Sequence, residues 1–405
     1  MKFLALACLL SSPLAAQQAL TLDEAVSTAL AGHPLLAEGR QRVASARGQS
    51  TQAGLTLNPR LVLQSENLRP PGSTPYVLGR DTDIFAYLQQ TMETAGKRGK
   101  RVELASHGLR RAEFEVEILR RQVALRVRHA YWAAAGMARI HELLVENQRN
   151  FQQIVEYHEI RVREGAMAES DLLRVRLEAD RIALAANNAK LEADRARIQL
   201  YREMGQMAFP EARLADPLEL KEDRLLAADA EEALRKRPEL QYARAQLEQT
   251  RANLVLQQAN ARPNYEVVFG YKRTAGLDTV LGGVQADLPF RNRNQGAIES
   301  AHAEIKAAEA SVAAAEAIIR AEVSAARVEY EMRRRQVTEF LGRFRAQAAE
   351  SSRIAQAAYR LGGADLLRLL DAERLRIEIE LINFRAMMEY RQSIVALENA
   401  VGTTP

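Results

Sequence analysis

The chain contains a long internal repeat, which constrains its fold more than any other feature. Two prolines of the first half return in the second half after the same interval of 204 residues: Pro34 matches Pro238, and Pro59 matches Pro263. The correspondence continues, with small slips, through further pairs: Ala29 with Ala233, Gly99 with Gly296, Tyr131 with Tyr330, and Asp171 with Asp365. Solenoid repeats are much shorter, with periods of roughly 20–50 residues. The chain is therefore a duplicated half-protein, and its function must suit a device with two similar halves.

Composition favours long helices packed as coiled coils over a thick globular core. Aromatic residues make up 5% of the 405 residues, Trp132 is the single tryptophan, and charged residues reach 27%. A chain of this kind, with few glycines and prolines outside discrete places, is typical of extended helices. On the predicted helices, acidic and basic residues interleave rather than cluster, which argues against a nucleic-acid partner.

Residues 1–16 have the pattern of a secretory signal peptide. Lys2 precedes an apolar stretch at residues 3–10, and small residues lead to an expected cleavage after Ala16. The only cysteine, Cys8, lies inside this segment. A lipid anchor on Cys8 would leave seven residues ahead of it, too few for an apolar stretch. Cleavage would give an exported chain without cysteine, and no later stretch reaches the roughly 20 apolar residues of a membrane-spanning helix.

The two repeats have the same predicted order of helix, helix, strand, strand, long helix and return helix. The first repeat covers residues 17–208, with strands at about 60–68 and 83–90 and a coiled coil at about 101–204. A connecting segment, 209–237, leads to the second repeat, 238–405, with strands at about 265–272 and 279–288 and a coiled coil at about 296–401. Apolar residues recur every seven positions in the first long helix, as a coiled coil requires: Val116, Val123, Ala130, Met137, Leu144 and Phe151.

The strands are unexpected in a coiled-coil chain. They alternate apolar and polar residues and have about the length, roughly 9–11 residues, that a tilted strand needs to cross a bilayer. Four strands cannot close a barrel, and an open sheet edge cannot lie in lipid. Either several chains each contribute four strands to one barrel, or the strands form two surface hairpins on a coiled-coil protein.

The chain resembles the TolC-type outer-membrane efflux family over essentially its whole mature length. Residues 359–362 (Tyr-Arg-Leu-Gly) and 370–372 (Leu-Asp-Ala) resemble the family's inner-tip signature, and Gly165 with Asp171 resembles the matching tip of the first half. Residues 288–290 (Leu-Pro-Phe) resemble its strand exit, and 93–98 (Glu-Thr-Ala-Gly-Lys-Arg) resemble the cobalt–zinc–cadmium type of heavy-metal efflux component. The resemblance implies a mostly α fold with a small membrane β-barrel, in which three chains pool their strands and helices into one channel-tunnel.

The resemblance also implies a function, a location and partners. The chain would be the outer-membrane exit duct of a tripartite efflux pump, with a long periplasmic extension, and would passively conduct small toxic solutes, heavy-metal cations among them. Its partners would be two further copies, a periplasmic adaptor (membrane fusion) protein, an inner-membrane transporter of the resistance-nodulation-division type, and outer-membrane lipid. Two alternatives stay open: the exit duct of a type I protein-secretion system, and a soluble periplasmic coiled-coil scaffold.

The resemblance places a gate near the second tip. Tyr359 and Asp171 would be a hydrogen-bonded pair between the two helical hairpins, and Asp371 would be an aspartate of the lumen. The chain departs from the family pattern at Arg368, where a second aspartate is usual, and at Ala364, where an arginine is usual. An Arg368–Asp371 pair is therefore an alternative lock. The alternative for Asp171 and Asp371 is that each only occupies the first turn of a helix, where the dipole favours an acid.

Two further surfaces are expected to bind partners. The tips, which would contact the adaptor, comprise Gly165, Ala166, Leu361, Gly362 and Gly363, and their glycines are also expected to end helices. A basic run precedes the first long helix, where cations oppose the helix dipole, so anionic lipid headgroups at the membrane interface are the expected partner. This run comprises Lys97, Arg98, Lys100 and Arg101, and a solvated charge run is its alternative interpretation.

The sequence predicts neither an enzyme nor a metal protein. Its six histidines are scattered without a ligand-like spacing, and no phosphate-binding loop, nucleophile elbow or catalytic triad is present. No cofactor, catalytic residue or metal site is expected.

Overall fold

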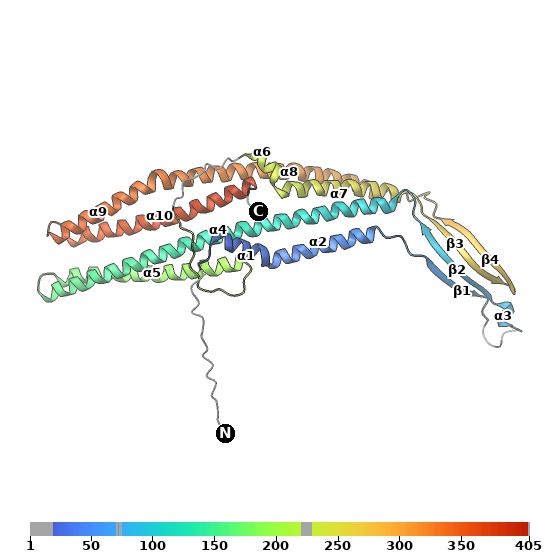
Figure 1. Ribbon diagram of the computed structural model, residues 1–405, viewed down its shortest axis with the longest axis horizontal. Helices are drawn as coiled ribbons and strands as arrows, with labels where there is room; N and C mark the ends of the chain where they lie inside the picture. Colours follow the sequence, from blue (N-terminus) through green and yellow to red (C-terminus); the bar gives the residue numbers. More distant parts are fainter. Residues whose placement is uncertain (1–18, 70–71, 73–74, 220–228, 404–405) are drawn as a thin grey trace, which may run out of the picture. The chain divides into compact units, whose positions relative to one another are not determined.

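A computed structural model describes residues 19–69, 72, 75–219 and 229–403, and the predicted signal peptide with Cys8 lies outside the described residues. The chain folds into helices and one four-stranded sheet (Figure 1). It divides into two compact units. We call Glu38–Ile118 with Arg237–Ile318 the sheet unit, and the remainder (Met1–Ala37, Leu119–Lys236 and Ile319–Pro405) the helical unit. Each predicted repeat contributes to both units, so the compact units cut across the sequence repeats.

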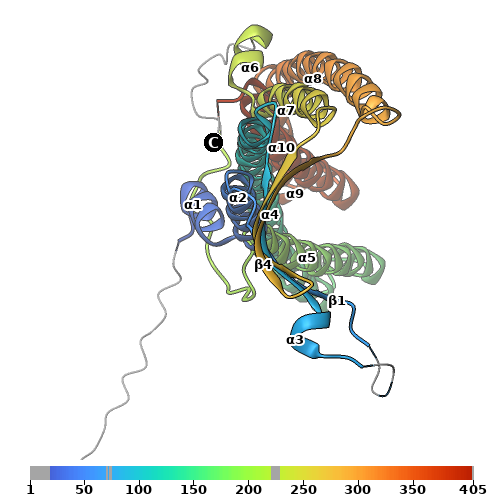
Figure 2. The same cartoon turned by 90° about the vertical axis from the view of Figure 1, so that its right-hand side faces the viewer.

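The sheet unit contains an antiparallel sheet in which the strands follow chain order (Figures 1 and 2). Its strands are β1 (Arg60–Glu66), β2 (Asp83–Met92), β3 (Tyr265–Thr274) and β4 (Leu277–Ala286). The pairing of β2 with β3, with Tyr87 opposite Gly270, joins the two repeats. Strand β1 ends two residues before the predicted limit, and β4 begins two residues before its predicted start. The fold is therefore mostly α with one small sheet, as the sequence predicts.

Helices complete the sheet unit. They are α2 (Pro34–Ala53), α3 (Leu78–Asp81), α7 (Pro238–Asn260) and the first parts of α4 (Lys97–Arg163) and α8 (Gln295–Arg335). Pro238 stands at the first position of α7, where its missing N–H costs nothing and its fixed φ suits a helix. The short α3 lies in the first strand-to-strand loop and was not predicted.

The helical unit contains two helical hairpins. The first joins the later part of α4 to α5 (Glu169–Glu203), and the second joins α9 (Gly342–Arg360) to α10 (Leu366–Val401). This unit also contains α1 (Leu22–Gly32), α6 (Ala230–Lys236) and the end of α8. Helix α1 begins with a capping box: Thr21 Oγ1 accepts from the Glu24 N–H (3.2 Å), and Glu24 Oε2 accepts from the Thr21 N–H (2.9 Å). Among the described residues, no helix combines the length and hydropathy needed to span a membrane.

A π-helical turn, η1 (Gln336–Leu341), separates α8 from α9. The sequence predicted one uninterrupted helix here, because neither proline nor a glycine cluster marks the place. A π turn adds a residue to the helical repeat and so shifts which side chains face inward. Val337 and Leu341 are buried, whereas Phe340 next to them is 45% exposed. The turn thus changes the packing face without breaking the helix.

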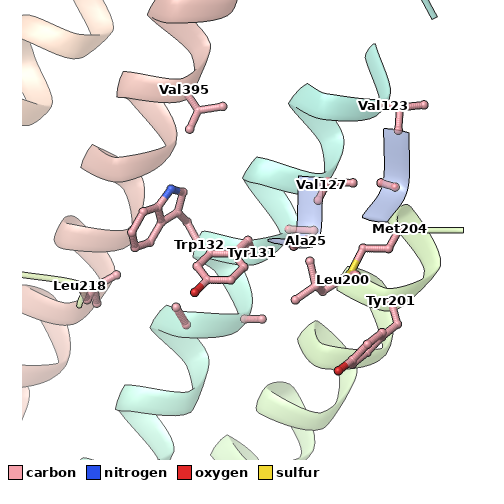
Figure 3. Close-up of a cluster of buried hydrophobic side chains, with 14 of the residues drawn as sticks. Ala25, Val123, Val127, Tyr131, Trp132, Leu200, Tyr201, Met204, Leu218 and Val395 are labelled. Carbon is pink, nitrogen blue, oxygen red and sulfur yellow. The ribbon is translucent and has the colours of Figure 1, made fainter. Parts of the chain in front are cut away.

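The core of the helical unit lies where α1, α4, α5, α10 and the segment after α5 meet (Figure 3). Tyr131 is fully buried, and its hydroxyl lies 2.8 Å from Asp216 Oδ2 and 3.0 Å from the Leu20 carbonyl oxygen. A single bridge pairs Leu20 with Leu214. Buried tyrosines need such a partner for the hydroxyl. Tyr131 therefore ties the start of the described chain and the connecting segment to the long helix α4.

Candidate gate, hairpin tips and sheet surfaces

The two hairpin tips end their helices in the same way. Gly165 and Gly362 adopt φ of +71° and +74°, the left-handed conformation that favours glycine. The next residue in each tip donates its N–H to the carbonyl oxygen five residues back, Ala166 to Arg161 and Gly363 to Ala358, both at 2.8 Å. This is the Schellman arrangement, which satisfies the last carbonyls of a helix. The expected capping role of these glycines is confirmed, and contact with an adaptor stays a prediction.

Near the tips, one hydrogen bond connects the first hairpin to the second. His158 of α4 is 1% exposed, and its Nε2 lies 2.7 Å from the hydroxyl of Tyr359 on α9. The two rings also stack, with centroids 5.7 Å apart. Burial raises the pKa of Tyr359, so its hydroxyl keeps its proton. Tyr359 thus joins the hairpins as expected, but through His158.

Asp171 does not form the expected hydrogen bond with Tyr359. It occupies the first turn of α5, the alternative placement that the helix dipole favours. Its charge nevertheless acts on the pair, because it opposes the effect of burial on the pKa of His158. Asp171 is therefore an electrostatic neighbour of the contact between the hairpins and not a member of it.

Asp371 pairs with a different arginine from the one expected. Its side chain is 62% exposed, and its carboxylate lies 4.0 Å from Arg374. The N-cap of α10 is Asp365, whose carboxylate accepts from the backbone N–H of Arg368 at 2.9 Å. Asp371 lies beyond the first turn of α10, so the dipole does not explain it. The Arg368–Asp371 lock is not formed in the described chain. Arg368 and Asp371 both project from the exposed side of α10.

A buried ion pair links α5 to α10. Glu178 is 3% exposed and accepts from Arg374 at 2.6 Å and from Arg181 at 2.5 Å. Burial alone would raise the pKa of Glu178, but the hydrogen bonds from both arginines outweigh burial and hold the pKa below its usual value. The same Arg374 thus balances a buried carboxylate on one hairpin and the exposed Asp371 on the other.

A second polar link connects α4 to α9 and α10. Glu373 of α10 is 4% exposed and accepts from Ser352 at 2.5 Å and from Gln356 at 2.6 Å, both on α9. Arg376 donates to Glu373 at 3.1 Å and to the side-chain oxygen of Asn147 on α4 at 2.5 Å. These residues line a cleft of about 780 Å³ that also reaches His158 and Tyr359. Buried polar groups here are satisfied by partners on other helices, which fixes how the helices meet.

The sequence contains a signal for the His158–Tyr359 contact and for the Asn147–Arg376 contact. His158 continues the seven-residue series that ends at Phe151, and Asn147 lies seven residues after the buried Ile140 on the same helix. A polar residue at a core position of a coiled coil costs stability and specifies the register of its partner. Such an interruption of the heptad identifies the linking residues, and the sequence analysis overlooked it.

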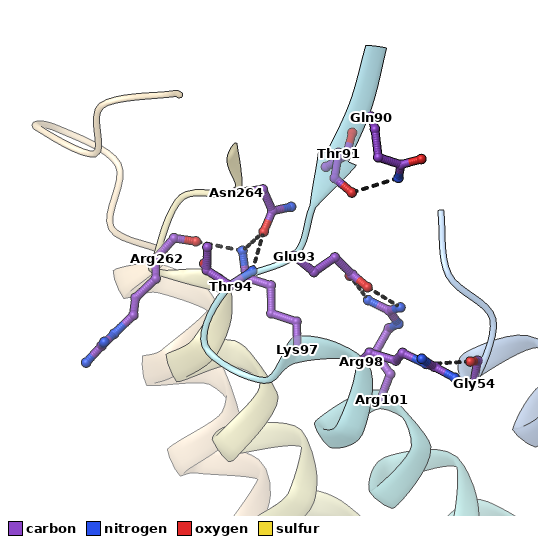
Figure 4. Close-up of polar contacts among 10 residues, drawn as sticks. All are labelled: Gly54, Gln90, Thr91, Glu93, Thr94, Lys97, Arg98, Arg101, Arg262 and Asn264. Atoms are coloured by element: carbon purple, nitrogen blue, oxygen red, sulfur yellow. Dashed lines mark hydrogen bonds and ion pairs between the residues drawn. The ribbon is translucent and has the colours of Figure 1, made fainter. Parts of the chain in front are cut away.

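Most cations of the basic run form contacts with other parts of the sheet unit (Figure 4). Lys97 is buried and donates to the Arg262 carbonyl oxygen and to Asn264 Oδ1, both at 2.6 Å. Its burial lowers its pKa. Arg101 forms a two-pronged ion pair with Glu93, and Arg98 donates to the Gly54 carbonyl oxygen at 2.6 Å.

Three cations of the run stabilise the turn between β2 and α4, a role that neither interpretation of the run predicted, and contact with lipid headgroups stays a prediction. Lys97 joins that turn to the second repeat, and Arg98 joins it to the end of α2. Only Lys100 makes no such contact among the described residues. The string at 93–98 that resembles heavy-metal efflux components also belongs to this turn, with Ala95 and Gly96 at positive φ.

The two faces of the sheet differ in polarity. Because directly paired residues share a face, the register separates an apolar face from a polar one. The apolar face is exposed, with Leu63 71%, Phe269 67% and Val280 71% accessible. Its apolar members are Leu61, Leu63, Ile84, Ala86, Leu88, Met92, Tyr265, Val267, Phe269, Tyr271, Val280, Val284 and Ala286, and polar residues such as Ser65, Gln90, Arg273 and Asp278 stand toward its ends. The other face is the more polar one: it carries Arg60, Gln64, Gln89, Glu266, Lys272, Thr279 and Gln285, interspersed with Val62, Phe85, Tyr87, Val268 and Leu281.

Gly270 lies on the polar face and permits close contact between β2 and β3. A methyl group at this position would overlap the Ala86 carbonyl oxygen and the backbone of Tyr87. Gly282 and Gly283 on β4 face open space. Only Gly270 among these three is required by packing within the described sheet.

Helix α5 carries a stripe of exposed apolar side chains. The members recur at intervals of four and seven residues, and each is between 43% and 62% exposed. They are Leu173, Leu177, Leu184, Leu191 and Ile198. A second exposed apolar set follows the end of α8, η1 and α9: Val328, Met332, Phe340, Phe344 and Ile354. Apolar stripes of this extent mark surfaces that another element covers.

Within the described residues, no three histidine, cysteine or acidic side chains come together in a way that could hold a metal ion.

Comparisons with solved structures identify the fold. A membrane protein from Pseudomonas aeruginosa is 19% identical, with a TM-score of 0.80 over 94% of this chain and 90% of that chain. CusC, whose structures concern folding and transmembrane channel formation, is 18% identical, with a TM-score of 0.80 over 94% and 92%. The open-state MtrE outer membrane channel of Neisseria gonorrhoeae is 18% identical, with a TM-score of 0.79 over 94% and 88%. The chain therefore has the fold of outer-membrane channels.

Part of the chain matches a known protein family. Residues 25–206, which comprise most of the first repeat, match the profile of the family described as outer membrane efflux protein. No individually curated protein matches the chain.

Proposed function

We propose that three copies of this chain assemble into the outer-membrane exit duct of a tripartite efflux pump. The duct passively conducts small toxic solutes from the periplasm to the exterior, and its helical hairpins extend into the periplasm. The observation that carries this proposal is the sheet, which exposes an apolar face and leaves the outer edges of β1 and β4 without a partner in the described chain.

Lipid is the solvent that suits this sheet. An exposed band of leucine, valine and phenylalanine on one face costs free energy in water, roughly 25 cal/mol for each Å² of apolar surface. In a membrane the same band is favourable, and Tyr265 and Tyr271 stand near its two ends, as interfacial aromatic residues do. The unpaired edges must then be closed by further copies, since lipid cannot satisfy their N–H and carbonyl groups. The polar face would line the pore.

The exposed stripes of the helical unit support the same assembly. The stripe on α5 and the set on α8, η1 and α9 belong to one chain, so each copy can offer one surface and accept the other. Heptad spacing on α5 fits coiled-coil packing against a neighbouring helix. Self-association through two different surfaces of one chain generates a closed ring when the rotation suits it.

The tips and the polar links would serve as the gate and the contact with the pump. Gly165 and Gly362, where an added methyl group would meet open space, leave the tips free for the helical hairpins of a periplasmic adaptor. The adaptor in turn would connect the duct to a transporter of the resistance-nodulation-division type. Tyr359, Asp371 and Arg368 would set the size and charge of the closed end, with Asp171 close by. Arg98, which stays exposed, and Lys100 are the members of the basic run that can reach lipid headgroups.

Detergent extraction tests the assembly. We expect a heat-sensitive trimer from the outer-membrane fraction that forms pores in planar lipid bilayers. A water-soluble monomer or dimer would contradict the proposal and favour the periplasmic scaffold.

Deletion of the gene tests the cargo. Greater sensitivity to zinc, cobalt or cadmium would identify metal cations as solutes, and greater sensitivity to antibiotics would identify drugs. Loss of a secreted protein from the medium, with unchanged sensitivity to all toxicants, would instead favour a type I secretion duct.

A further inference from the structure

The protonation state of His158 follows from its two hydrogen bonds. Its Nδ1 lies 2.7 Å from the carbonyl oxygen of Ile154, which can only accept, so Nδ1 carries the proton. In a neutral imidazole the other nitrogen is then an acceptor. Nε2 therefore accepts the hydroxyl proton of Tyr359, 2.7 Å away on the other hairpin. With His158 neutral, the hydroxyl proton of Tyr359 has an acceptor. A second proton on His158 would reverse this hydrogen bond and place a positive charge on a side chain that is only 1% exposed.

Charged groups around His158 do not compensate a second proton. On its own helix, Arg161 disfavours a positive charge, and Tyr157 packs edge-on at a centroid distance of 5.3 Å. Asp171 on α5 favours the charge without contacting the ring. The remaining titratable groups that line the shared cleft are three arginines and one paired carboxylate on α9 and α10: Arg353, Arg360, Arg376 and Glu373. Apolar Leu369 of α10 also lines this cleft.

We propose that His158 is a proton-sensitive latch near the tips. Neutral, it holds the α4–α5 hairpin to the α9–α10 hairpin through Tyr359. Protonated in mild acid, it releases this contact and lets the tips separate, while the Glu178–Arg374 and Asn147–Arg376 links, farther from the tips, remain. The inference rests on the proposed function, because it names what opens the closed end of the duct. The π turn η1 (Gln336–Leu341) directly precedes α9, at the end of that helix that lies away from the tip. A π turn is a place where a helix can bend.

The direction of the effect follows from burial. Burial lowers the pKa of His158, and the positive charge of Arg161 lowers it further. The hydrogen bond to the Ile154 carbonyl oxygen and the negative charge of Asp171 act in the opposite direction but do not cancel the lowering. The latched state therefore binds a proton less readily than a released, solvated histidine, whose pKa is about 6.5. Latching is fully favoured above that value. As the pH falls below it, the ratio of latched to released protein decreases by up to about tenfold for each pH unit, until the lower pKa of the latched state is reached.

Distances between spin labels on the two tips measure the latch without any transport. Because the expected mature chain lacks cysteine, labels attach only at Glu164→Cys and Leu361→Cys, both exposed tip positions. Double electron–electron resonance on the detergent-solubilised trimer should show short distances between the two labels at pH 7.5 and longer distances at pH 5. Glutamine can keep an acceptor near the position of Nε2 but does not titrate, so His158→Gln should stay latched at both pH values.

Two more variants separate the latch from general effects of acid. Tyr359→Phe keeps the stacked ring but removes the hydroxyl, and it should show the long distances at pH 7.5. His141→Gln, a half-buried histidine of the same helix, should respond to pH as the unmodified protein does. An unmodified protein whose distances do not change with pH, or a His158→Gln variant that changes equally, would overturn the latch. Conductance of the same samples in planar bilayers tests the proposed duct separately. A protein that conducts, but whose label-to-label distances do not depend on pH, refutes only the latch.

Discussion

Phe269 offers the sharpest test of whether the apolar face of the sheet lies in lipid. It is 67% exposed, in the middle of β3, and is flanked by Leu88 and Gly282 on the neighbouring strands. On a sheet in water, Phe269→Lys would replace an exposed apolar side chain by a soluble one and change stability by less than about 0.5 kcal/mol. The two environments therefore predict opposite outcomes for one substitution.

The penalty in lipid can be worked out from its parts. A lysine at the middle of the bilayer on the lipid face of a barrel costs about 2–4 kcal/mol. Loss of the buried phenylalanine side chain adds about 1.5–3 kcal/mol. The sum is about 4–7 kcal/mol for each copy, and a trimer would bear it three times. This total is comparable with or larger than the roughly 5–15 kcal/mol that separates a folded from an unfolded domain.

The assay is the fraction of chain recovered as heat-sensitive trimer in the outer membrane. Phe269→Lys should abolish that fraction. The control is Gln285→Lys, which places the same charge on the polar face of β4, opposite Glu266. The control should assemble normally, because in the proposed barrel the residues of the polar face contact the water of the pore. Normal assembly of Phe269→Lys would refute the assignment of this face to lipid.

Three other predictions follow from particular contacts. Gly270→Ala should destabilise the sheet by about 1–3 kcal/mol or more, because the new methyl group overlaps the β2 backbone. The control Gly282→Ala places its methyl group in open space and should change the melting temperature of the trimer little, so equal melting temperatures of the two variants would contradict this prediction. Glu178→Gln and Arg374→Gln should each lower stability by about 1.5–3 kcal/mol, and a double-mutant cycle should give a coupling clearly above zero; additive losses would show that the pair does not join α5 to α10. Asp371→Asn should weaken block of the pore by multivalent cations in planar bilayers, and Arg374→Gln, which removes the positive neighbour at 4.0 Å, should strengthen it; unchanged block in both variants would reject a place for Asp371 in the pore.

Most of the architecture was predictable because it rests on periodic patterns. The heptad series through Val123 and Phe151 gave the long helix α4, and both residues are buried as that series requires. Alternation gave the strands, since a sheet with one apolar face must alternate. The π turn at Gln336–Leu341 was not predictable in this way, because a single extra residue leaves helix propensity unchanged and alters only the packing face.

The candidate site was only partly predictable, because its contacts join residues far apart in sequence. Tyr359 was identified, but its partner His158 stands 201 residues away and was counted among the scattered histidines. Lys97 was misinterpreted for a related reason. A basic run looks the same in sequence whether it faces lipid or, as here, binds carbonyl oxygens of a distant loop.

The strand order β1-β2-β3-β4 has a consequence for how many copies can associate. With an even number of strands in strictly alternating direction, the last strand of one copy runs opposite to the first strand of the next. Copies can therefore join edge to edge with the same antiparallel hydrogen bonding whether a ring contains two, three or four of them. Strand pairing alone is thus indifferent to stoichiometry. The number of copies must be set by sheet curvature and by how the apolar stripes of the helices fit their neighbours, so changes in those stripes should alter the size of the pore.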